Sequence, residues 1–242
     1  LCNAKEIKVI SLDRIKLKIK NVKFIYGDLC DFEFCKKITK NIDYVFHVAG
    51  IKGSVKVTVE KPASFFVPLL MFNTNVLEAS RINNVQKLVY TSSIGAYSSN
   101  EVFIESDDEN QGPPMDMYPG WAKRMAEMQI KAYQIQYNLE GYSIVRPCNV
   151  YGPGDNFDPE NAMVIPSLMS RIRSGEDPIQ IWGDGSAIRD FVYSYDVANS
   201  MIKIMEKGYN KPVNVGSGTG VSIKELVEKL QKIFNYSFDV EW

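Results

Sequence analysis

Residues 87–93 read Lys-Leu-Val-Tyr-Thr-Ser-Ser, a short apolar run that ends in hydroxyl side chains. A short apolar run between polar residues predicts a buried β-strand, here over residues 87–91. On either side, residues 73–82 and 121–137 have the length and apolar spacing of helices, and each leads into a strand through a short polar turn. This alternation predicts parallel strands joined by helices.

Other short apolar runs extend the same rhythm toward both ends of the chain. They lie at residues 7–12, 22–26, 44–47 and 143–145. Short connections between such elements favour one doubly wound parallel sheet of the Rossmann type, an α/β fold. After Tyr151 the sequence becomes rich in Gly, Pro, Asp and Asn. We therefore expect a Rossmann domain over residues 1–150 and a smaller C-terminal substrate lobe over residues 151–242, both truncated at the chain ends.

Two helices are expected in this C-terminal lobe. The first lies near residues 165–174, after the loop-rich stretch. The second covers residues 222–234, where Ser222 followed three residues later by Glu225 has the pattern of a capping box.

Composition excludes several functional classes. The 242 residues are 45% apolar and 24% charged, as in soluble globular proteins. A formal net charge of −1 gives no electrostatic reason to expect nucleic acid or a membrane surface as a partner. No apolar stretch approaches the roughly 18 residues of a membrane span. The four cysteines lack Cys-x-x-Cys spacing and there is one histidine, so we expect reduced thiols, no metal site and a cytoplasmic protein.

Asp13 stands at the carboxyl end of the expected strand over residues 7–12. In a dinucleotide-binding fold, a carboxylate there binds the adenosine ribose hydroxyls and repels a 2′-phosphate, which favours NAD over NADP. The alternative is a turn residue, because Asp is common after strands. A glycine-rich turn precedes such an acid by about 20 residues, and only twelve residues precede Asp13. We therefore expect the first strand and its glycine-rich turn to be absent from this chain.

Several segments, taken in order, resemble the extended short-chain dehydrogenase/reductases. They are Gly-Asp-Leu at 27–29, Val-Phe-His-Val-Ala-Gly at 45–50 and Lys-Leu-Val-Tyr-Thr-Ser-Ser at 87–93. In this interpretation Asp28 accepts a hydrogen bond from the adenine amino group and Leu29 packs on the ring, although a simple turn aspartate competes. Ala49 and Gly50 would let the cofactor pass close to the backbone. His47 is interpreted as a buried structural residue rather than a general base.

The family's chemistry requires a tyrosine to exchange a proton with the sugar, a lysine to lower the pKa of that tyrosine, and a serine to hold the reacting oxygen. Ser93, within Tyr-Thr-Ser-Ser-Ile-Gly-Ala-Tyr-Ser, resembles the family serine. Lys123 resembles the lysine of the family's Tyr-x-x-x-Lys helix and would also contact the cofactor. Here the sequence departs from the family, because Pro119 stands four residues before Lys123 and Tyr118 stands five before it.

The spacing of Tyr118 decides whether it can work with Lys123. Residues five apart on a helix differ by roughly 140° in azimuth, against roughly 40° for residues four apart. Pro119 suits the first helical position, which would leave Tyr118 in a non-helical cap conformation that reaches the nicotinamide. We take Tyr118 as the catalytic acid. The alternatives are that the role is lost or is met by another residue.

Residues 146–154, Arg-Pro-Cys-Asn-Val-Tyr-Gly-Pro-Gly, resemble the family's segment between cofactor and substrate. The resemblance implies that Pro147 lies by the nicotinamide and that Asn149 hydrogen-bonds the substrate. A simple Gly/Pro turn after a strand explains residues 151–154 but not the residues before them.

Residues 154–168 resemble the GDP-L-fucose synthases in particular, although Met163 stands where those enzymes carry a histidine as a second acid. Residues 181–198 resemble the family's nucleotide-sugar segment. That resemblance places Trp182 near the base or ribose and Arg189 at the diphosphate, where a guanidinium suits phosphate oxygens. The alternatives are a core tryptophan and a solvated arginine.

These observations predict an NAD-dependent epimerase or reductase that acts at C4 of a nucleotide-diphosphate sugar by hydride transfer, with a GDP sugar favoured. A UDP-hexose 4-epimerase is the nearest alternative. A non-catalytic dinucleotide-binding module is an alternative of another class, because the tyrosine is displaced. A dehydratase is less favoured, since Ile94 and Gly95 follow Ser93 where those enzymes carry an acidic pair. Members of the family are often dimers, which implies a homodimer.

Overall fold

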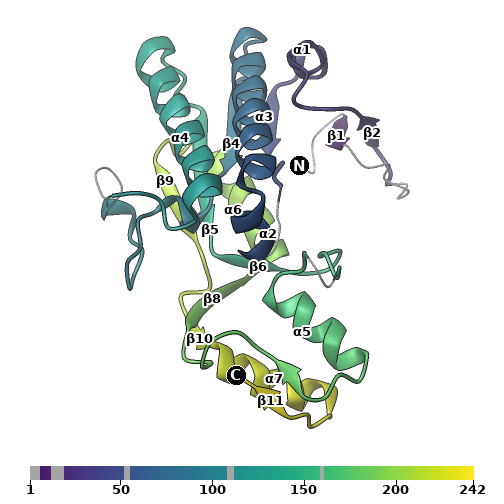
Figure 1. Cartoon of the computed structure of the whole chain (residues 1–242). Coiled ribbons are helices and arrows are strands. Elements are labelled where there is room, and N and C mark those ends of the chain that lie inside the picture. Colours follow the sequence, from purple (N-terminus) through teal and green to yellow (C-terminus); the bar gives the residue numbers. More distant parts are fainter. Residues whose placement is uncertain (1–5, 12–18, 52–54, 108–111, 159–160) are drawn as a thin grey trace.

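The computed structural model of the chain describes residues 6–11, 19–51, 55–107, 112–158 and 161–242. Asp13, predicted to bind the cofactor ribose, lies outside the described residues. The elements form an upper layer around a parallel sheet and a lower lobe, which are joined by extended segments (Figure 1).

The upper layer is built on a four-stranded parallel sheet in the order β3-β4-β5-β9. Its strands are β3 (Tyr44–His47), β4 (Lys87–Thr91), β5 (Tyr142–Pro147) and β9 (Pro212–Val215). Sequence analysis predicted the bounds of β3 and β4 correctly and predicted only the centre of β5. The predicted α/β fold with parallel strands is confirmed.

Helices cover both faces of this sheet. On one face α3 (Pro62–Ile82) and α4 (Met117–Tyr137) share a core with Leu88 and Tyr90. On the other face α6 (Ser194–Lys207) packs against Val89 and Val145. Successive residues of β4 thus point to opposite apolar layers, as the alternation of side chains along a strand requires.

A separate pair of parallel strands lies at the edge of the upper layer. β1 (Ile7–Ser11) pairs with β2 (Val22–Tyr26), and among the described residues neither pairs with β3. Figure 1 shows this pair set off to one side of α3. The helix that follows β2, α1 (Phe32–Thr39), ties the pair to the rest of the layer, because Cys35 packs with residues of α3.

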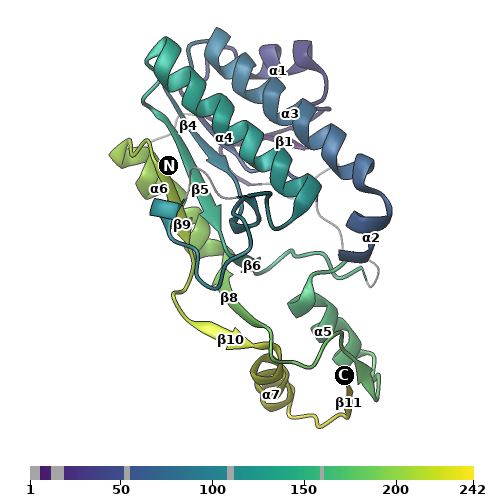
Figure 2. The ribbon, with the colours of Figure 1, turned by 60° about the vertical axis from the view of Figure 1, so that its left-hand side comes forward.

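The lower lobe contains a second sheet, in the order β10-β8-β6, with helices beside it (Figure 2). Its elements are β6 (Asn149–Tyr151), α5 (Val164–Arg173), β7 (Ile179–Gln180), β8 (Ile188–Tyr193), β10 (Gly220–Ser222), α7 (Ile223–Phe234) and β11 (Val240–Glu241). Buried residues of α5 and α7, with Ile179 and Phe238, form its core. The predicted capping box is confirmed: the Ser222 side chain accepts from the Glu225 amide at 3.1 Å.

Several boundaries differ from the prediction for physical reasons. The helix expected from residue 73 begins at Pro62, because Phe65 and Leu69 bury against the layer and add turns to it. Beyond residue 151, α6 and β9 return to the main sheet, so this part of the chain serves the upper layer as well as the lower lobe.

Short elements complete the fold. They are α2 (Val55–Glu60) and the 3-10 turns η1 (Ile94–Ala96) and η2 (Glu105–Asp107). Within the described ranges, no helix is both long and apolar enough to cross a membrane.

Candidate active site

The carboxyl ends of β3, β4 and β5 lie at one edge of the main sheet, because these strands are parallel and in register. Gly50 follows β3, Ser93 follows β4, and Pro147 ends β5. In open α/β sheets, ligands bind outside the carboxyl ends of the strands. The sheet therefore gathers residues predicted from three separate segments at one edge.

Two predicted catalytic residues meet at the end of β4. The Lys123 ammonium donates to the Thr91 carbonyl at 2.6 Å and lies 5.2 Å from the centroid of the Tyr90 ring. The Ser93 hydroxyl accepts from the amide of Gly95 at 3.0 Å, which caps η1. Both side chains are held by backbone groups, so this end of the strand presents a hydroxyl and a cation in fixed positions.

The predicted start of the catalytic helix is wrong. Helix α4 begins at Met117, so Tyr118 lies inside the helix and not in a cap conformation before Pro119. The cause is the chain that enters the helix: the amides of Met115 and Asp116 donate to the carbonyls of Tyr97 and Gly95, at 2.6 Å and 3.3 Å. These bonds fix the segment before α4 against η1.

Tyr118 therefore does not share a helix face with Lys123, since residues five apart differ by roughly 140°. Its side chain is 46% exposed, and its ring centroid lies 5.8 Å from that of Phe66 on α3. The role of Tyr118 as acid stays a prediction without support from this placement.

The contact between η1 and α4 depends on two glycines. A Cβ atom on Gly120 would lie 2.5 Å from the Gly95 carbonyl oxygen, so only glycine permits this approach. A Cβ atom on Gly95 would clash with the carboxyl group of Asp116. Sequence analysis did not identify Asp116. The one hint in the sequence was the glycine at residue 95, because a residue without a side chain leaves room for a group from elsewhere in the fold.

The residues predicted to bind the adenosine half of the cofactor are placed unevenly. Asp28 accepts from the Cys30 amide at 2.8 Å, which is the geometry of the competing turn interpretation. Leu29 is half-buried against α1 and α3. Ala49 packs in the same layer, whereas no atom of the described residues lies within 4 Å of a Cβ atom built on Gly50. The open space at Gly50 fits a cofactor that passes the end of β3.

The described residues fit the nicotinamide half of a dinucleotide better than its pyrophosphate. Lys123, Ser93 and Pro147 stand at neighbouring strand ends, where a nicotinamide ring and its ribose would lie. Within the described ranges no glycine-rich turn joins a strand to a helix, so these residues offer no cradle for the pyrophosphate.

His47 is a buried structural residue, as predicted. It is 3% exposed, and its Nε2 lies 2.9 Å from Oδ1 of Asn73. The Asn73 amide in turn donates to the Tyr90 hydroxyl at 3.1 Å. Burial disfavours the imidazolium and lowers the pKa of His47 to about 3. A neutral histidine within a strand holds the sheet to α3.

Asn149 and Arg189 lie on paired strands of the lower lobe, β6 and β8. The Asn149 amide donates to the Asp190 carbonyl at 2.9 Å. Arg189 is exposed, and its guanidinium donates to the Ile188 carbonyl at 2.7 Å. Trp182 is 77% exposed, which excludes the alternative of a core tryptophan. The Asp190 carboxylate accepts from the backbone amides of residues 217 and 218, both at 2.9 Å.

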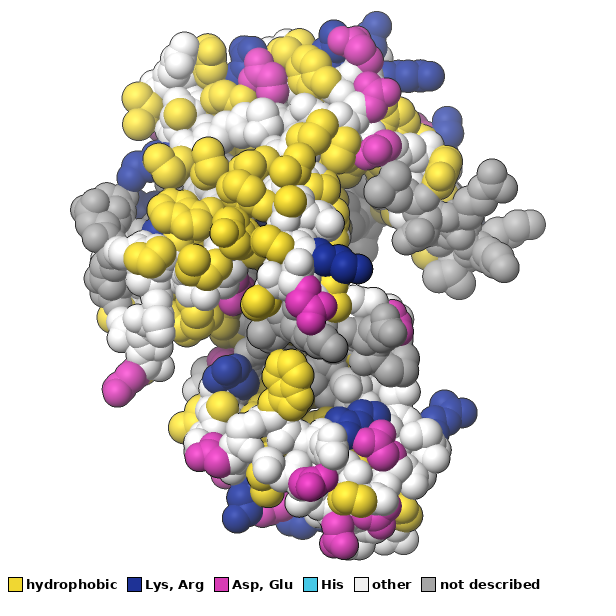
Figure 3. Space-filling model, in the orientation of Figure 1, with side chains coloured by type: hydrophobic (Ala, Val, Ile, Leu, Met, Phe, Trp, Pro, Cys, Tyr) yellow, Lys and Arg dark blue, Asp and Glu magenta, His cyan; other side chains and the backbone are white. Residues whose placement is uncertain are grey.

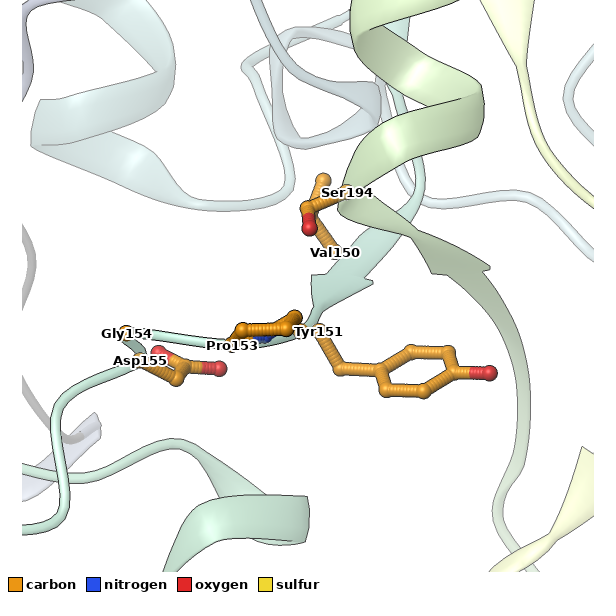
Figure 4. Close-up of a pocket in the computed structure, with 7 residues that line it drawn as sticks. Val150, Tyr151, Pro153, Gly154, Asp155 and Ser194 are labelled. Atoms are coloured by element: carbon orange, nitrogen blue, oxygen red, sulfur yellow. The ribbon is translucent and has the colours of Figure 1, made fainter. Parts of the chain in front are cut away.

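A small pocket follows directly on Asn149 (Figure 4). It has a volume of about 160 Å³ and is lined by Val150, Tyr151, Gly152, Pro153, Gly154, Asp155 and Ser194. Ser194 lies at the start of α6, and a Cβ atom on Gly152 would clash with its hydroxyl. Small-molecule sites commonly measure about 300–1,000 Å³, so this pocket is smaller than a usual ligand site.

A buried ion pair underlies the site and was not predicted. Arg146 and Glu127, 3% and 6% exposed, join β5 to α4 by two hydrogen bonds, one of 2.9 Å between Nε and Oε1. The guanidinium also stacks 4.4 Å from the centroid of the Tyr97 ring. An arginine inside a buried strand requires a partner of opposite charge. The arginine within the apolar run of β5 could therefore have indicated a buried ion pair, although not which residue supplies the carboxylate.

Comparison with known proteins identifies relatives along the chain. A family model described as the NAD dependent epimerase/dehydratase family matches residues 1–216. The chain is 31% identical over 208 residues to the probable GDP-L-fucose synthase 1 of Oryza sativa subsp. japonica, a match that covers 82% of this chain and 63% of that protein. It is 33% identical over 227 residues to a putative UDP-glucose 4-epimerase of Methanocaldococcus jannaschii, covering 91% and 72% respectively.

A solved structure shares the fold over nearly the whole chain. The UDP-glucose 4-epimerase of Thermotoga maritima, solved with UDP-glucose, gives a TM-score of 0.86 at 28% identity, covering 99% of this chain and 79% of that one. The match to the rice protein, by contrast, spans 63% of that protein, which is less than two thirds of its length.

Proposed function

The chain belongs to the NAD dependent epimerase/dehydratase family, and from this membership we propose that it forms most of an enzyme that acts on a nucleotide-diphosphate sugar. The reaction is a hydride transfer at C4 of the sugar, as an epimerase or a reductase. The observation that carries the proposal is the placement of Ser93 and Lys123 at the end of β4. A hydroxyl and a fixed cation at a strand end suit a sugar oxygen that gains or loses a proton.

The cofactor is NAD in this proposal, because an acid at residue 13 disfavours a 2′-phosphate. When bound, the nicotinamide supplies or accepts the hydride. The Lys123 ammonium would hold the nicotinamide ribose beside Pro147, and Ser93 would orient the sugar oxygen. The first strand and its glycine-rich turn are proposed to come from sequence outside these 242 residues. The separation of the β1–β2 pair from β3 supports this.

The substrate is bound by the lower lobe. Arg189 pairs with the diphosphate and Trp182 stacks on the base or ribose, because both side chains are exposed on that lobe. Asn149 hydrogen-bonds the sugar at the boundary between the layers. A GDP sugar is favoured by the stretch from residue 153 to 161 and by the likeness to the rice GDP-L-fucose synthase.

A UDP-hexose 4-epimerase is the second candidate. It is favoured by the likeness to the Thermotoga maritima enzyme, whose structure contains UDP-glucose. The two candidates differ in the nucleotide base and in whether the cofactor is consumed, because an epimerase returns the hydride to the sugar.

The enzyme is proposed to form a homodimer through the outer surface of α3 and α4. Large apolar side chains gather there (Figure 3). This α3/α4 apolar face consists of Val67, Met71, Trp121, Met125, Met128 and Ile135, each between 38% and 79% exposed. On α4, Trp121, Met125 and Met128 lie four and three residues apart and Ile135 follows seven residues later, the spacing that lets two helices interlock along a seam. A second copy of the chain presents the same seam.

Glutamate at both Met125 and Met128 tests the dimer. Charges buried in the seam lack partners, so the double substitution should convert a dimer into a monomer in sedimentation velocity. Ile51, also 37% exposed but after β3, provides a control position, and Ile51→Glu should leave the sedimentation coefficient unchanged. A wild type that sediments as a monomer contradicts the proposal.

The activity is tested with a panel of GDP and UDP sugars. The full-length protein, charged with NAD or NADH, is incubated with each sugar, and the products are identified by NMR at C4. Turnover of a GDP-4-keto sugar with consumption of NADH supports the first candidate. Interconversion of UDP-glucose and UDP-galactose without net NADH supports the second. Binding of NAD without turnover of any sugar supports a non-catalytic dinucleotide-binding module and contradicts the proposal.

A further inference from the structure

The carboxyl group of Asp116 occupies the place of a missing side chain beside Ser93. Asp116 precedes α4 and its amide donates to the Gly95 carbonyl at 3.3 Å. A Cβ atom on Gly95 would clash with the Asp116 carboxyl, so the carboxyl fills the space in front of residue 95. Because the Gly95 amide donates to the Ser93 hydroxyl, that space adjoins the serine.

Asp116 contacts the turn that follows Ser93. Its carboxyl lies against Gly95, two residues after Ser93, and Lys123 binds the Thr91 carbonyl two residues before Ser93. The Tyr118 ring packs on Phe66 of α3 instead. A general acid or base must lie within hydrogen-bond reach of the proton it transfers.

We infer that Asp116 is the residue that exchanges a proton with the sugar oxygen in the proposed reaction. The inference rests on the proposed function. During oxidation at C4, the hydroxyl proton passes to the Asp116 carboxylate while the C4 hydride passes to the oxidised nicotinamide, which leaves a carbonyl. Reduction reverses both transfers, so the proton returns from the carboxyl group to the oxygen.

The charges around Asp116 suit this role. Burial by its neighbours raises the pKa of Asp116, and Arg189 of β8 acts against that effect. The other charged groups on α4 and β8 are Lys123, Arg124, Glu127, Lys131 and Asp190. Lys123 and Arg124 bind the carbonyls of residues 91 and 96, Glu127 pairs with Arg146, and the Asp190 carboxylate binds residues 217 and 218. Turn η1 carries no charge.

This arrangement links substrate binding to protonation. A diphosphate that pairs with Arg189 cancels the charge that lowers the pKa of Asp116. Asp116 should therefore take up a proton when the nucleotide binds, and the protonated carboxyl group is the form that donates the proton when a 4-keto sugar is reduced. The coupling concerns binding alone and does not require the cofactor.

The first test compares amide substitutions in the full-length enzyme. Asp116→Asn removes the titratable group and should lower kcat by about 10²-fold or more, with a smaller change in KM. Glu101→Gln makes the same chemical change at an exposed residue outside the site and should leave kcat unchanged. Equal kcat for wild type and Asp116→Asn in an active enzyme overturns the inference.

A double variant that moves the carboxyl group to a neighbouring residue distinguishes loss of the acid from loss of folding. Asp116→Gly combined with Gly95→Asp moves the carboxyl to the residue whose space it already occupies. We expect this double variant to recover part of the kcat that Asp116→Gly alone loses. Recovery by Gly95→Ala with Asp116→Gly would contradict a role for the carboxyl, because that pair restores bulk without an acid.

The second test measures proton uptake when UDP or GDP binds. Calorimetry in buffers of different ionisation enthalpy, at mildly acidic pH and without cofactor, should show uptake by the wild type and by Glu101→Gln. Asp116→Asn should lose it, and equal uptake in that variant overturns the inference. If the wild type turns over no nucleotide sugar, the proposed function fails. If the wild type is active and Asp116→Asn has the same kcat and the same proton uptake, this inference fails while the proposed function stands.

Discussion

The end of β4 and the exposed surface of the lower lobe hold their side chains in different ways. At the end of β4, Lys123 donates to the Thr91 carbonyl of the strand, and Ser93 accepts from the Gly95 amide of η1. On the lower lobe, Trp182 is 77% exposed and Arg189 reaches solvent from β8. A site that must fix a reacting oxygen needs rigid groups, whereas a surface that captures a ligand can order its side chains when the ligand arrives.

The largest effect on activity is expected at the end of β4. Lys123→Met removes the ammonium at the Thr91 carbonyl and keeps an apolar stem of similar length. We expect kcat to fall by about 10²–10⁴-fold while the affinity for UDP or GDP stays near that of wild type. Steady-state kinetics and calorimetry on the same preparation measure the two quantities. A loss of nucleotide affinity with kcat retained would reverse the division of roles.

The buried ion pair of Arg146 and Glu127, which joins β5 to α4, should matter for the stability of the fold. Glu127→Ala leaves the buried Arg146 guanidinium without its carboxylate, which costs about 3–5 kcal/mol in the free energy of unfolding. Chemical denaturation measures the change. The exposed pair of Lys36 and Glu33 on α1 is the control, because Glu33→Ala should cost less than about 1 kcal/mol. Equal costs for the two variants would show that the buried pair adds no special support.

Substitution of Arg189 should lower nucleotide affinity, whereas substitution of Lys123 should lower kcat. Arg189→Gln removes the cation offered to the diphosphate and should weaken the binding of UDP or GDP by about 10–100-fold, since hydrogen bonds to charged groups contribute about 1.5–3 kcal/mol. The melting temperature should stay within experimental error, because the side chain is exposed. Unchanged nucleotide affinity would remove Arg189 from the substrate site.

Trp182 should give the smallest effect. Trp182→Ala removes a ring that is 77% exposed, so the free energy of unfolding should change by less than about 0.5 kcal/mol. Nucleotide affinity should fall by about fivefold, which corresponds to about 1 kcal/mol, the lower end of the range for stacking on a base. Fluorescence titration with UDP and GDP compares the two nucleotides. A marked loss of stability would show that the ring supports the lobe.

The same contrast explains what the sequence could predict. The strands β3 and β4 were predicted with the correct bounds, because a short apolar run between polar turns has few alternatives. The capping box at Ser222 was predicted because its pattern is local. His47 was recognised as structural for a related reason, since it lies inside an apolar strand.

Features that depend on distant residues were missed. The start of α4 depends on hydrogen bonds from Met115 and Asp116 to residues 97 and 95, and no pattern near Pro119 reveals those bonds. The Asp116 carboxyl in front of Gly95 is likewise a tertiary contact. Local propensity describes a segment by itself, and these contacts join segments far apart in the chain.

The most direct test of the account follows a hydrogen atom. The full-length protein is mixed with NADH that carries deuterium at the transferred position and with a GDP-4-keto or UDP-4-keto sugar, and the sugar is recovered and examined by mass spectrometry. We predict deuterium at C4 of the sugar with the wild type and much less with Lys123→Met over the same time. A protein that binds both the cofactor and the sugar yet leaves C4 unlabelled would contradict this account.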